Sequence, residues 1–238
     1  MKRSLIFLLA GLAGALALAC GSDEDKIDED RAEEIAERAL LAKSHLPGRN
    51  WQETARDDFE ESDDFPETDA CEELNDFFEE LDEGDDEPLV VTNVTYEREQ
   101  SDDEPISLSI EAEIEVHEGT ASDIDFQKEA DRILEDAGFD ECMEDFAEQA
   151  GEEIGGEGEY ERRDPTAKAP EDGFAMSFAI RFILGEEEFE AVGELYIWNY
   201  KHVQSQVAFL GTEDQMDEDL IEDVLDEAAD RVRAAQED

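Results

Sequence analysis

The clearest pattern in the chain is an alternation of apolar and polar residues over positions 106–116. The apolar residues occupy every second position: Ile106, Leu108, Ile110, Ala112, Ile114 and Val116. The polar residues between them are Ser107, Ser109, Glu111, Glu113 and Glu115. A period of two predicts a β-strand with one apolar and one polar face. The polar face predicts an antiparallel sheet with one side that lies in water or lines a cleft.

Four further segments predict strands: residues 90–96, 174–184, 189–200 and 203–210. They are rich in β-branched and aromatic residues, and the connections between the last three are short, which predicts a meander. Glycines and prolines over residues 151–173 predict a loop that has room for a short strand near Tyr160.

Apolar residues at helical spacing predict helices over residues 29–44, 74–81, 126–137 and 217–235. A further turn or two is predicted around residues 142–150. Pro47 and Gly48 are expected to stop the first helix, Gly138 to close the third, and Thr212 or Asp214 to cap the last. Trp51 is predicted to fill a place in the core.

The order of these elements is helices, two strands, helices, three strands and a final helix. Such an order is typical of the α+β class. We therefore expect a largely antiparallel sheet of about five strands, packed with N-terminal, middle and C-terminal helices.

The N-terminus has the pattern of a bacterial signal peptide. Lys2 and Arg3 precede the apolar run 5–18, which is too short to span a bilayer comfortably because a helix needs about 20 apolar residues. The small residues before Cys20 resemble the lipobox of bacterial lipoproteins, although Ala17 stands where that motif usually has leucine. The resemblance implies that Cys20 is diacylated and becomes the mature N-terminus. A plain secretory signal is the alternative.

These features predict three parts: a signal peptide (1–19), a lipid-anchored tether (20–28) and a single α+β extracytoplasmic domain (29–238). The expected location is the outer face of the cell membrane, and the expected membrane contact is the lipid on Cys20.

The two remaining cysteines, Cys71 and Cys142, are expected to form a disulfide, because an even pair in an oxidising compartment is normally bonded. Two separate buried thiols are the alternative. Their spacing is not that of a metal site.

The charge is extreme, with 73 Asp and Glu against 18 Lys and Arg and a net charge of -55. Such a surface repels nucleic acid, so no nucleic-acid partner is expected. The acid excess, and the low share of lysine among the basic residues, resemble proteins of halophilic organisms, in which salt screens the self-repulsion. An acidic envelope protein from a moderate habitat fits equally well.

Motifs that carry chemistry are missing. His45, His117 and His202 are far apart in the sequence, and no spacing typical of a zinc protease, nucleophile elbow, dinucleotide loop or P-loop occurs. No catalytic residue, metal site or cofactor is therefore predicted, and the protein is not expected to be an enzyme. Loose calcium or magnesium binding in acidic runs such as 82–87 is less favoured than a solvated acidic surface.

Three aromatic residues, Tyr196, Trp198 and Tyr200, lie two apart and so share one face of a predicted strand. They are the candidate lining of a cleft for a small apolar or aromatic ligand. The alternative is that helices cover them as ordinary core.

A family resemblance rests on short motifs: Ala39-Leu40-Leu41, then Leu46-Pro47-Gly48 and Trp51, with one cysteine before the core of each half. Residues 28–235 resemble the extracellular sensor domain of PknH-type bacterial serine/threonine kinases and related small actinobacterial lipoproteins. The resemblance implies a ligand-binding or sensing cleft but assigns no ligand. Those sensor domains carry two disulfides, whereas this chain has cysteines for one.

The expected function is that of a lipid-anchored extracytoplasmic binding or sensor-like lipoprotein. Two alternatives stay open: a salt-adapted structural envelope protein without a ligand, and a hydrolase with an unrecognised carboxylate site.

Overall fold

The protein is described from a computed structural model of the chain. It describes residues 26–54, 68, 71–72, 88–98, 106–120, 138–185 and 187–237. The predicted signal peptide, Cys20 and the predicted helices at 74–81 and 126–137 lie outside these residues. Among the helices that the structure does describe, none is long and apolar enough to cross a membrane.

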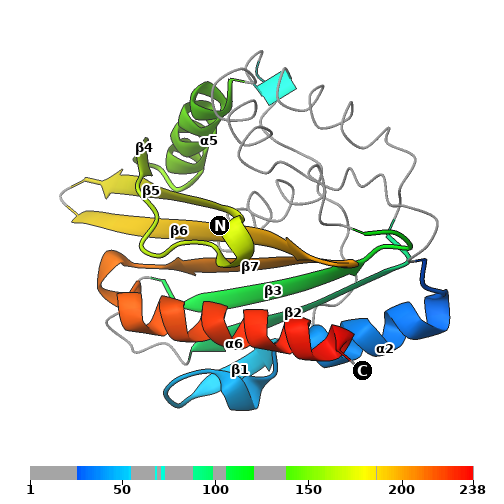
Figure 1. Cartoon of the computed structure of the whole chain (residues 1–238). Helices are drawn as coiled ribbons and strands as arrows, with labels where there is room; N and C mark the ends of the chain where they lie inside the picture. Colours follow the sequence, from blue (N-terminus) through cyan, green and yellow to red (C-terminus); the bar gives the residue numbers. More distant parts are fainter. Residues whose placement is uncertain are drawn as a thin grey trace.

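Within the described residues, seven antiparallel strands form one sheet, in the order β1-β2-β3-β7-β6-β5-β4 (Figure 1). Their bounds are β1 Trp51–Thr54, β2 Val90–Arg98, β3 Ser109–Val116, β4 Glu157–Arg163, β5 Phe174–Leu184, β6 Glu187–Tyr200 and β7 Val203–Gly211. The α+β class and the antiparallel sheet are thus confirmed. The sheet has seven strands rather than about five.

The two additional strands are β1 and β4, which form the edges of the sheet. β4 is the short strand for which the predicted loop had room near Tyr160, whereas β1 was not predicted. Each has a single large apolar residue, Trp51 in β1 and Tyr160 in β4, and is otherwise polar or small. Edge strands are commonly polar, because polar and charged side chains prevent pairing with other chains. Their strand conformation comes from pairing with β2 and β5, which a periodicity test does not detect.

Three α-helices lie in the described part of the chain: α2 Glu29–Ala39, α5 Phe139–Glu153 and α6 Glu218–Gln236. The first ends five residues before its predicted end at residue 44. Arg231 of α6 donates to the backbone oxygens of Arg38 and Leu40, at 2.7 and 2.8 Å, and so satisfies carbonyls at the end of α2. The contacts from Arg231 thus bind the carbonyl oxygens of Arg38 and Leu40 at the point where α2 ends, in place of the further helical turn that was predicted up to residue 44.

The start of α6 differs slightly from its prediction. Asp217, not Thr212 or Asp214, caps the helix by accepting from the backbone N–H of Leu220. Thr212 instead caps the short 3₁₀ turn Glu213–Gln215 that precedes it.

The turn predicted around residues 142–150 is the full helix α5, which packs directly on β4. Gly151 and Gly158 allow this approach, because a Cβ on Gly158 would lie 1.8 Å from the carbonyl oxygen of Ala147. Because α5 continues to Glu153, it includes residues 151–153, which were predicted to belong to a loop.

The two faces of the sheet carry separate cores. On one face α6 and α2 cover apolar residues of β2, β3, β6 and β7. On the other face α5 packs on β5 and β6. Trp51 is a core residue, as predicted, and lies in the core beneath α6. Burying each large apolar side chain contributes about 1.5–3 kcal/mol.

The polar face of β3 is not in water. Glu111 and Glu115 are 3% and 7% exposed, Ser107 and Ser109 are also buried, and Glu113 is half-buried. The prediction that this face lies in water is therefore wrong for β3, and the alternative, that it lines a cleft, stays a prediction. Alternation along a strand reveals the character of each face but not what the folded chain places over it.

Candidate functional site

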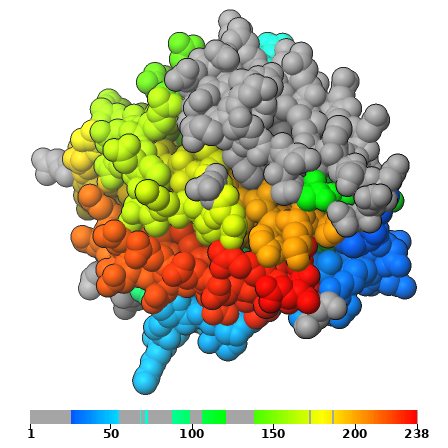
Figure 2. Space-filling model, in the orientation of Figure 1, coloured from blue at the N-terminus to red at the C-terminus, as the bar shows by residue number. Residues whose placement is uncertain are grey.

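A groove of about 720 Å³ lies between α6 and the segment that joins β4 to β5. Figure 2 shows these two elements side by side on one surface, α6 in orange-red and the joining segment in yellow-green. The volume lies within the range of about 300–1,000 Å³ that ligand pockets usually have. This groove is the candidate site.

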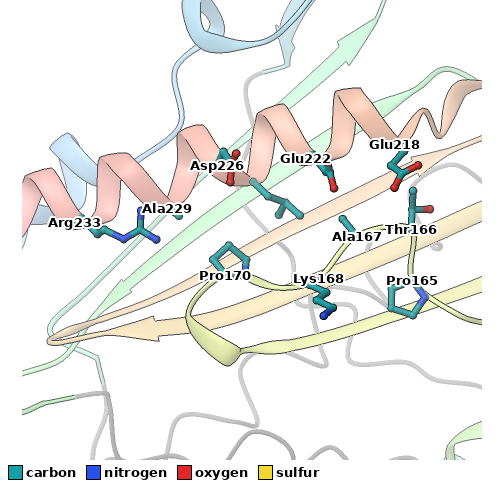
Figure 3. Close-up of a pocket in the computed structure, with 11 residues that line it drawn as sticks. Pro165, Thr166, Ala167, Lys168, Pro170, Glu218, Glu222, Asp226, Ala229 and Arg233 are labelled. Atoms are coloured by element: carbon teal, nitrogen blue, oxygen red, sulfur yellow. The ribbon is translucent and has the colours of Figure 1, made fainter.

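One wall of the groove is a face of α6. Three carboxylates along this face, Glu218, Glu222 and Asp226, are exposed and follow each other every four residues (Figure 3). Residues at that spacing lie on the same side of a helix. Leu225 and Ala229 add a buried apolar surface beside them.

The opposite wall is the joining segment itself. It contributes Pro165, Thr166, Ala167, Lys168 and Pro170. In Figure 3 the side chain of Lys168 extends away from α6. Proline fixes its own backbone φ angle, so the two prolines reduce the freedom of this wall.

A buried carboxylate, Glu194 of β6, anchors the joining segment to the sheet. It accepts hydrogen bonds from the backbone N–H of Thr166, at 3.3 Å, and from the Thr166 hydroxyl. The hydroxyls of Ser177, at 3.5 Å, and Tyr196 also donate to it. Glu194 is only 2% exposed, and a buried charge needs such donors because burial otherwise costs several kcal/mol.

Tyr196 binds the next residue of the joining segment, Ala167, in addition to Glu194. Its hydroxyl donates to Glu194 and accepts from the backbone N–H of Ala167 at 3.2 Å. Burial, and then the hydrogen bond to Glu194, raise the pKa of Tyr196 well above its ordinary value. Tyr196 therefore stays protonated and keeps donating to Glu194 at neutral pH.

Two other tyrosines, the buried Tyr96 and the half-buried Tyr160, also have raised pKa values and allow a pH test. Burial, followed by the hydrogen bond to Asp140, raises the pKa of Tyr160, and burial, followed by Glu53, raises the pKa of Tyr96. Below about pH 10 these tyrosines are protonated in both the folded and the unfolded chain, so the difference in their pKa values does not change the free energy of unfolding. Above it, only the unfolded chain ionises, so stability is lost as the pH rises.

We therefore expect the free energy of unfolding to fall above about pH 10, by up to about 1.4 kcal/mol per pH unit for each of the three tyrosines. Denaturant titrations at several alkaline pH values measure this slope, and tyrosinate absorbance follows ionisation of the folded chain. Tyr196→Phe is expected to make the slope shallower. Ionisation of all three near pH 10 in the folded chain would contradict the prediction.

The far end of the joining segment is attached to α6 by an ion pair. The guanidinium of Arg233 lies 2.7 Å from Glu171 and 2.7 Å from Asp230. The hydrogen bond to Glu171 raises the pKa of Arg233, so the pair keeps its charges. Next to it, Gly173 packs so closely on β6 that a Cβ would lie 2.2 Å from the carbonyl oxygen of Ile197.

The predicted aromatic ladder does not line the groove. Tyr196 and Trp198 are 0% exposed and belong to the core beneath α6, and Tyr200 is half-buried. The prediction that they face a ligand is corrected for Tyr196 and Trp198: α6 covers that face of β6. Tyr196 instead lies behind the wall of the groove and holds it.

The predicted cysteine pair comes together. The Sγ atoms of Cys71 and Cys142 lie 2.01 Å apart, at disulfide distance, and both residues are fully buried beside α5. The cysteines lie in the opposite core from the groove. Their contribution is to stability rather than to the site.

The histidines and acidic residues do not assemble a metal centre in the parts of the chain that can be described. No group of three His, Cys, Asp or Glu there is arranged to hold a metal ion. His117 lies 3.6 Å from Glu115, and His45 lies 3.3 Å from Glu227 on the other side of the sheet.

Sequence reasoning missed Glu194 and the acidic face of α6. Glu194 is a single acid inside the apolar run of β6, two residues before Tyr196, and such an interruption is a detectable signal of a buried polar contact. Glu218, Glu222 and Asp226 could also have been grouped by their spacing. The abundance of acids in this chain hides both signals.

Comparison with protein-family models, curated proteins and solved structures gives no match to this chain.

Proposed function

We propose that this protein is a lipid-anchored extracytoplasmic binding protein that takes its ligand in the groove between α6 and the segment joining β4 to β5. The observation that carries the proposal is that contacts within the protein hold this segment at both of its ends. Glu194 and Tyr196 bind one end of it, and Arg233 binds the other. A wall that is already ordered saves the entropy that binding would otherwise cost.

The membrane location rests on the N-terminal sequence, in which Lys2, Arg3 and the apolar run precede Cys20. The resemblance to extracellular sensor domains supports the same assignment. A binding protein on the outer surface would meet ligands that arrive from outside the cell.

Binding is favoured over catalysis by the state of Glu194. A carboxylate has about four lone-pair sites, and Glu194 already accepts from Thr166, Ser177 and Tyr196. These donors occupy its oxygens, so Glu194 serves the protein's own contacts. Its place behind the wall also suits an anchor better than a general base.

Native mass spectrometry of the whole chain, purified from the membranes of its own host, tests the proposal. We expect a mass excess in the native state that disappears on denaturation. Ala167→Trp, which places an indole in the groove, is expected to abolish the excess. Asp164→Trp is the matched control, because Asp164 is exposed in the same joining segment but does not line the groove, and it is expected to keep the excess.

The melting temperature of both variants is measured alongside, so that loss of binding is separated from loss of folding. An excess that survives Ala167→Trp would contradict the groove as the site. No excess in any form of the protein would instead favour the salt-adapted structural envelope protein.

A further inference from the structure

One stretch at the surface of this acidic chain contains no acid. Residues 38–52 have no Asp or Glu, although the whole chain has 73, and they include Lys43 and Arg49, whose side chains are exposed. The stretch runs into β1, the edge strand, and forms the light-blue projection at the lower edge of the molecule in Figure 2. The groove lies elsewhere, because its joining segment packs on β6, four places away in the sheet.

Arg98, the last residue of β2, lies against this stretch. It is the register partner of Trp51, and the Cζ atom of its guanidinium lies 4.9 Å from the centre of the Trp51 ring. Its Nη2 atom lies beside Gly48, where a Cβ would come within 3.3 Å. A cation–π contact of this kind holds a guanidinium in place without using its N–H groups.

The guanidinium of Arg98 has no acceptor among the residues that the structure describes. It makes no ion pair or side-chain hydrogen bond with any of them, and its Nε atom is buried without a partner. Glu53, on the same face of β1, pairs in register with Tyr96 and forms no ion pair with Arg98. The other half-buried arginines described each bind a carboxylate or a carbonyl oxygen: Arg31, Arg38, Arg163, Arg231 and Arg233.

A guanidinium has five N–H donors, and donors that are partly buried without an acceptor cost free energy. The donors of Arg98 are therefore available to an acceptor that the described residues do not supply. Lys43 and Arg49 likewise form no ion pair with those residues, so they add positive charge to the same part of the surface.

The local charge, not the net charge of -55, decides what this surface attracts at ordinary salt. Charges farther apart than about 10 Å are largely screened at about 0.1 M salt, so distant acids contribute little. A guanidinium matches the paired oxygens of a carboxylate or a phosphoryl group. The phosphoryl group is favoured here, because its second negative charge also gains from neighbouring cations.

We propose that this surface binds a phosphoryl group on the Nη atoms of Arg98, with Arg49 and Lys43 supplying additional positive charge. The phosphoryl group belongs either to a soluble phosphate or to a phospholipid headgroup, which share this chemistry. The site is separate from the groove and does not depend on the proposed function.

The test follows the indole N–H signals of the whole chain by NMR during titration with sodium phosphate at about 0.1 M salt. The chain has two tryptophans, so two such signals are expected. The Nε1–H of Trp51 donates to the backbone oxygen of Pro47 at 2.8 Å, beneath Arg98, and its signal is expected to shift until the site is saturated. The signal of Trp198, which is fully buried beneath α6, is expected to stay in place.

Arg98→Met keeps an unbranched side chain over Trp51 but removes the charge and the donors. We expect the affinity for phosphate to fall about tenfold, as loss of a charged hydrogen-bond donor permits. The matched control is Arg181→Met, which removes the same charge from β5, where Arg181 is exposed and pairs with Glu159 and Glu188. Its affinity is expected to stay within about twofold.

Arg49→Gln is a second variant, in which an exposed side chain is changed and folding is not at risk. Its affinity is expected to fall about threefold. The melting temperature of every variant is measured alongside, so that a loss of binding is separated from a loss of folding.

A short-chain phosphatidylglycerol, kept below its micelle concentration, is titrated in the same way. A shift of the Trp51 signal with this lipid alone assigns the phospholipid headgroup, and a shift with sodium phosphate alone assigns a soluble phosphate. Sodium chloride at the same ionic strength is expected to leave the signal in place. The proposal would be overturned by no shift with either probe, by an equal shift with chloride, or by equal losses of affinity in Arg98→Met and Arg181→Met.

Discussion

Replacing Cys71 and Cys142 together by alanine is expected to lower the free energy of unfolding by about 4 kcal/mol. The bond would close a loop of sequence separation 71, and in the chain-entropy model opening such a loop increases the entropy of the unfolded chain by this amount. Both side chains are fully buried beside α5, so the variant also loses some packing. Urea titration measures the change.

Reduction of the unmodified chain is the control, because it opens the loop without removing a side chain. The reduced chain is expected to unfold at a lower urea concentration and with a larger dependence on urea, since its unfolded state exposes more surface. Thiol titration of the denatured, unreduced protein should find neither Cys71 nor Cys142 free. Two free thiols, or equal midpoints for reduced and unreduced chains, would refute the disulfide.

Glu194→Ala is expected to destabilise the protein by about 3 kcal/mol, because it leaves buried donors of Thr166, Ser177 and Tyr196 without their acceptor. The loss is expected to be local as well as global. Hydrogen exchange of the Thr166 and Ala167 amides should accelerate more than exchange in β6. Loosening of this wall is also expected to weaken any ligand in the groove.

Glu190→Ala is the matched control for this substitution. Glu190 precedes Glu194 on the same face of β6 and pairs with Arg163 at 3.0 Å, but its side chain is 27% exposed. An ion pair that water reaches contributes about 1 kcal/mol or less, so the control should cost no more than that. A Glu194→Ala variant that is as stable as Glu190→Ala would show that Glu194 does not anchor the segment.

The elements with strong periodicity could be predicted from the sequence. The alternation of Ile110, Ala112 and Ile114 predicts β3, and the spacing of Leu220, Ile221 and Val224 predicts α6. The edge strand β1 could not, and β4 could be expected only as a short strand near Tyr160, because each of them has one large apolar residue. Their conformation depends on hydrogen bonds to neighbouring strands rather than on their own pattern.

The candidate site was harder to predict than the fold. The sequence pointed to the aromatic ladder, and Trp198 is instead core, whereas Tyr196 holds the groove from behind. Nothing in the sequence pairs Thr166 with Glu194, which is 28 residues away, or Arg233 with Glu171, which is 62 residues away. These contacts exist because β6 and α6 bring distant residues to the same place.

The sequence by itself determined the class of the fold, the apolar face of each regular strand and helix, and the pairing partners available to two cysteines. The first two follow from the spacing of apolar residues along each segment, and the third follows from the number of cysteines, so none of them requires knowledge of distant contacts. The tertiary structure alone decided the edge strand β1, the extent of β4, the burial of Glu111 and Glu115, and the groove beside α6. The physical reason is that burial and hydrogen bonding depend on what lies across the sheet, and a one-dimensional pattern does not contain it.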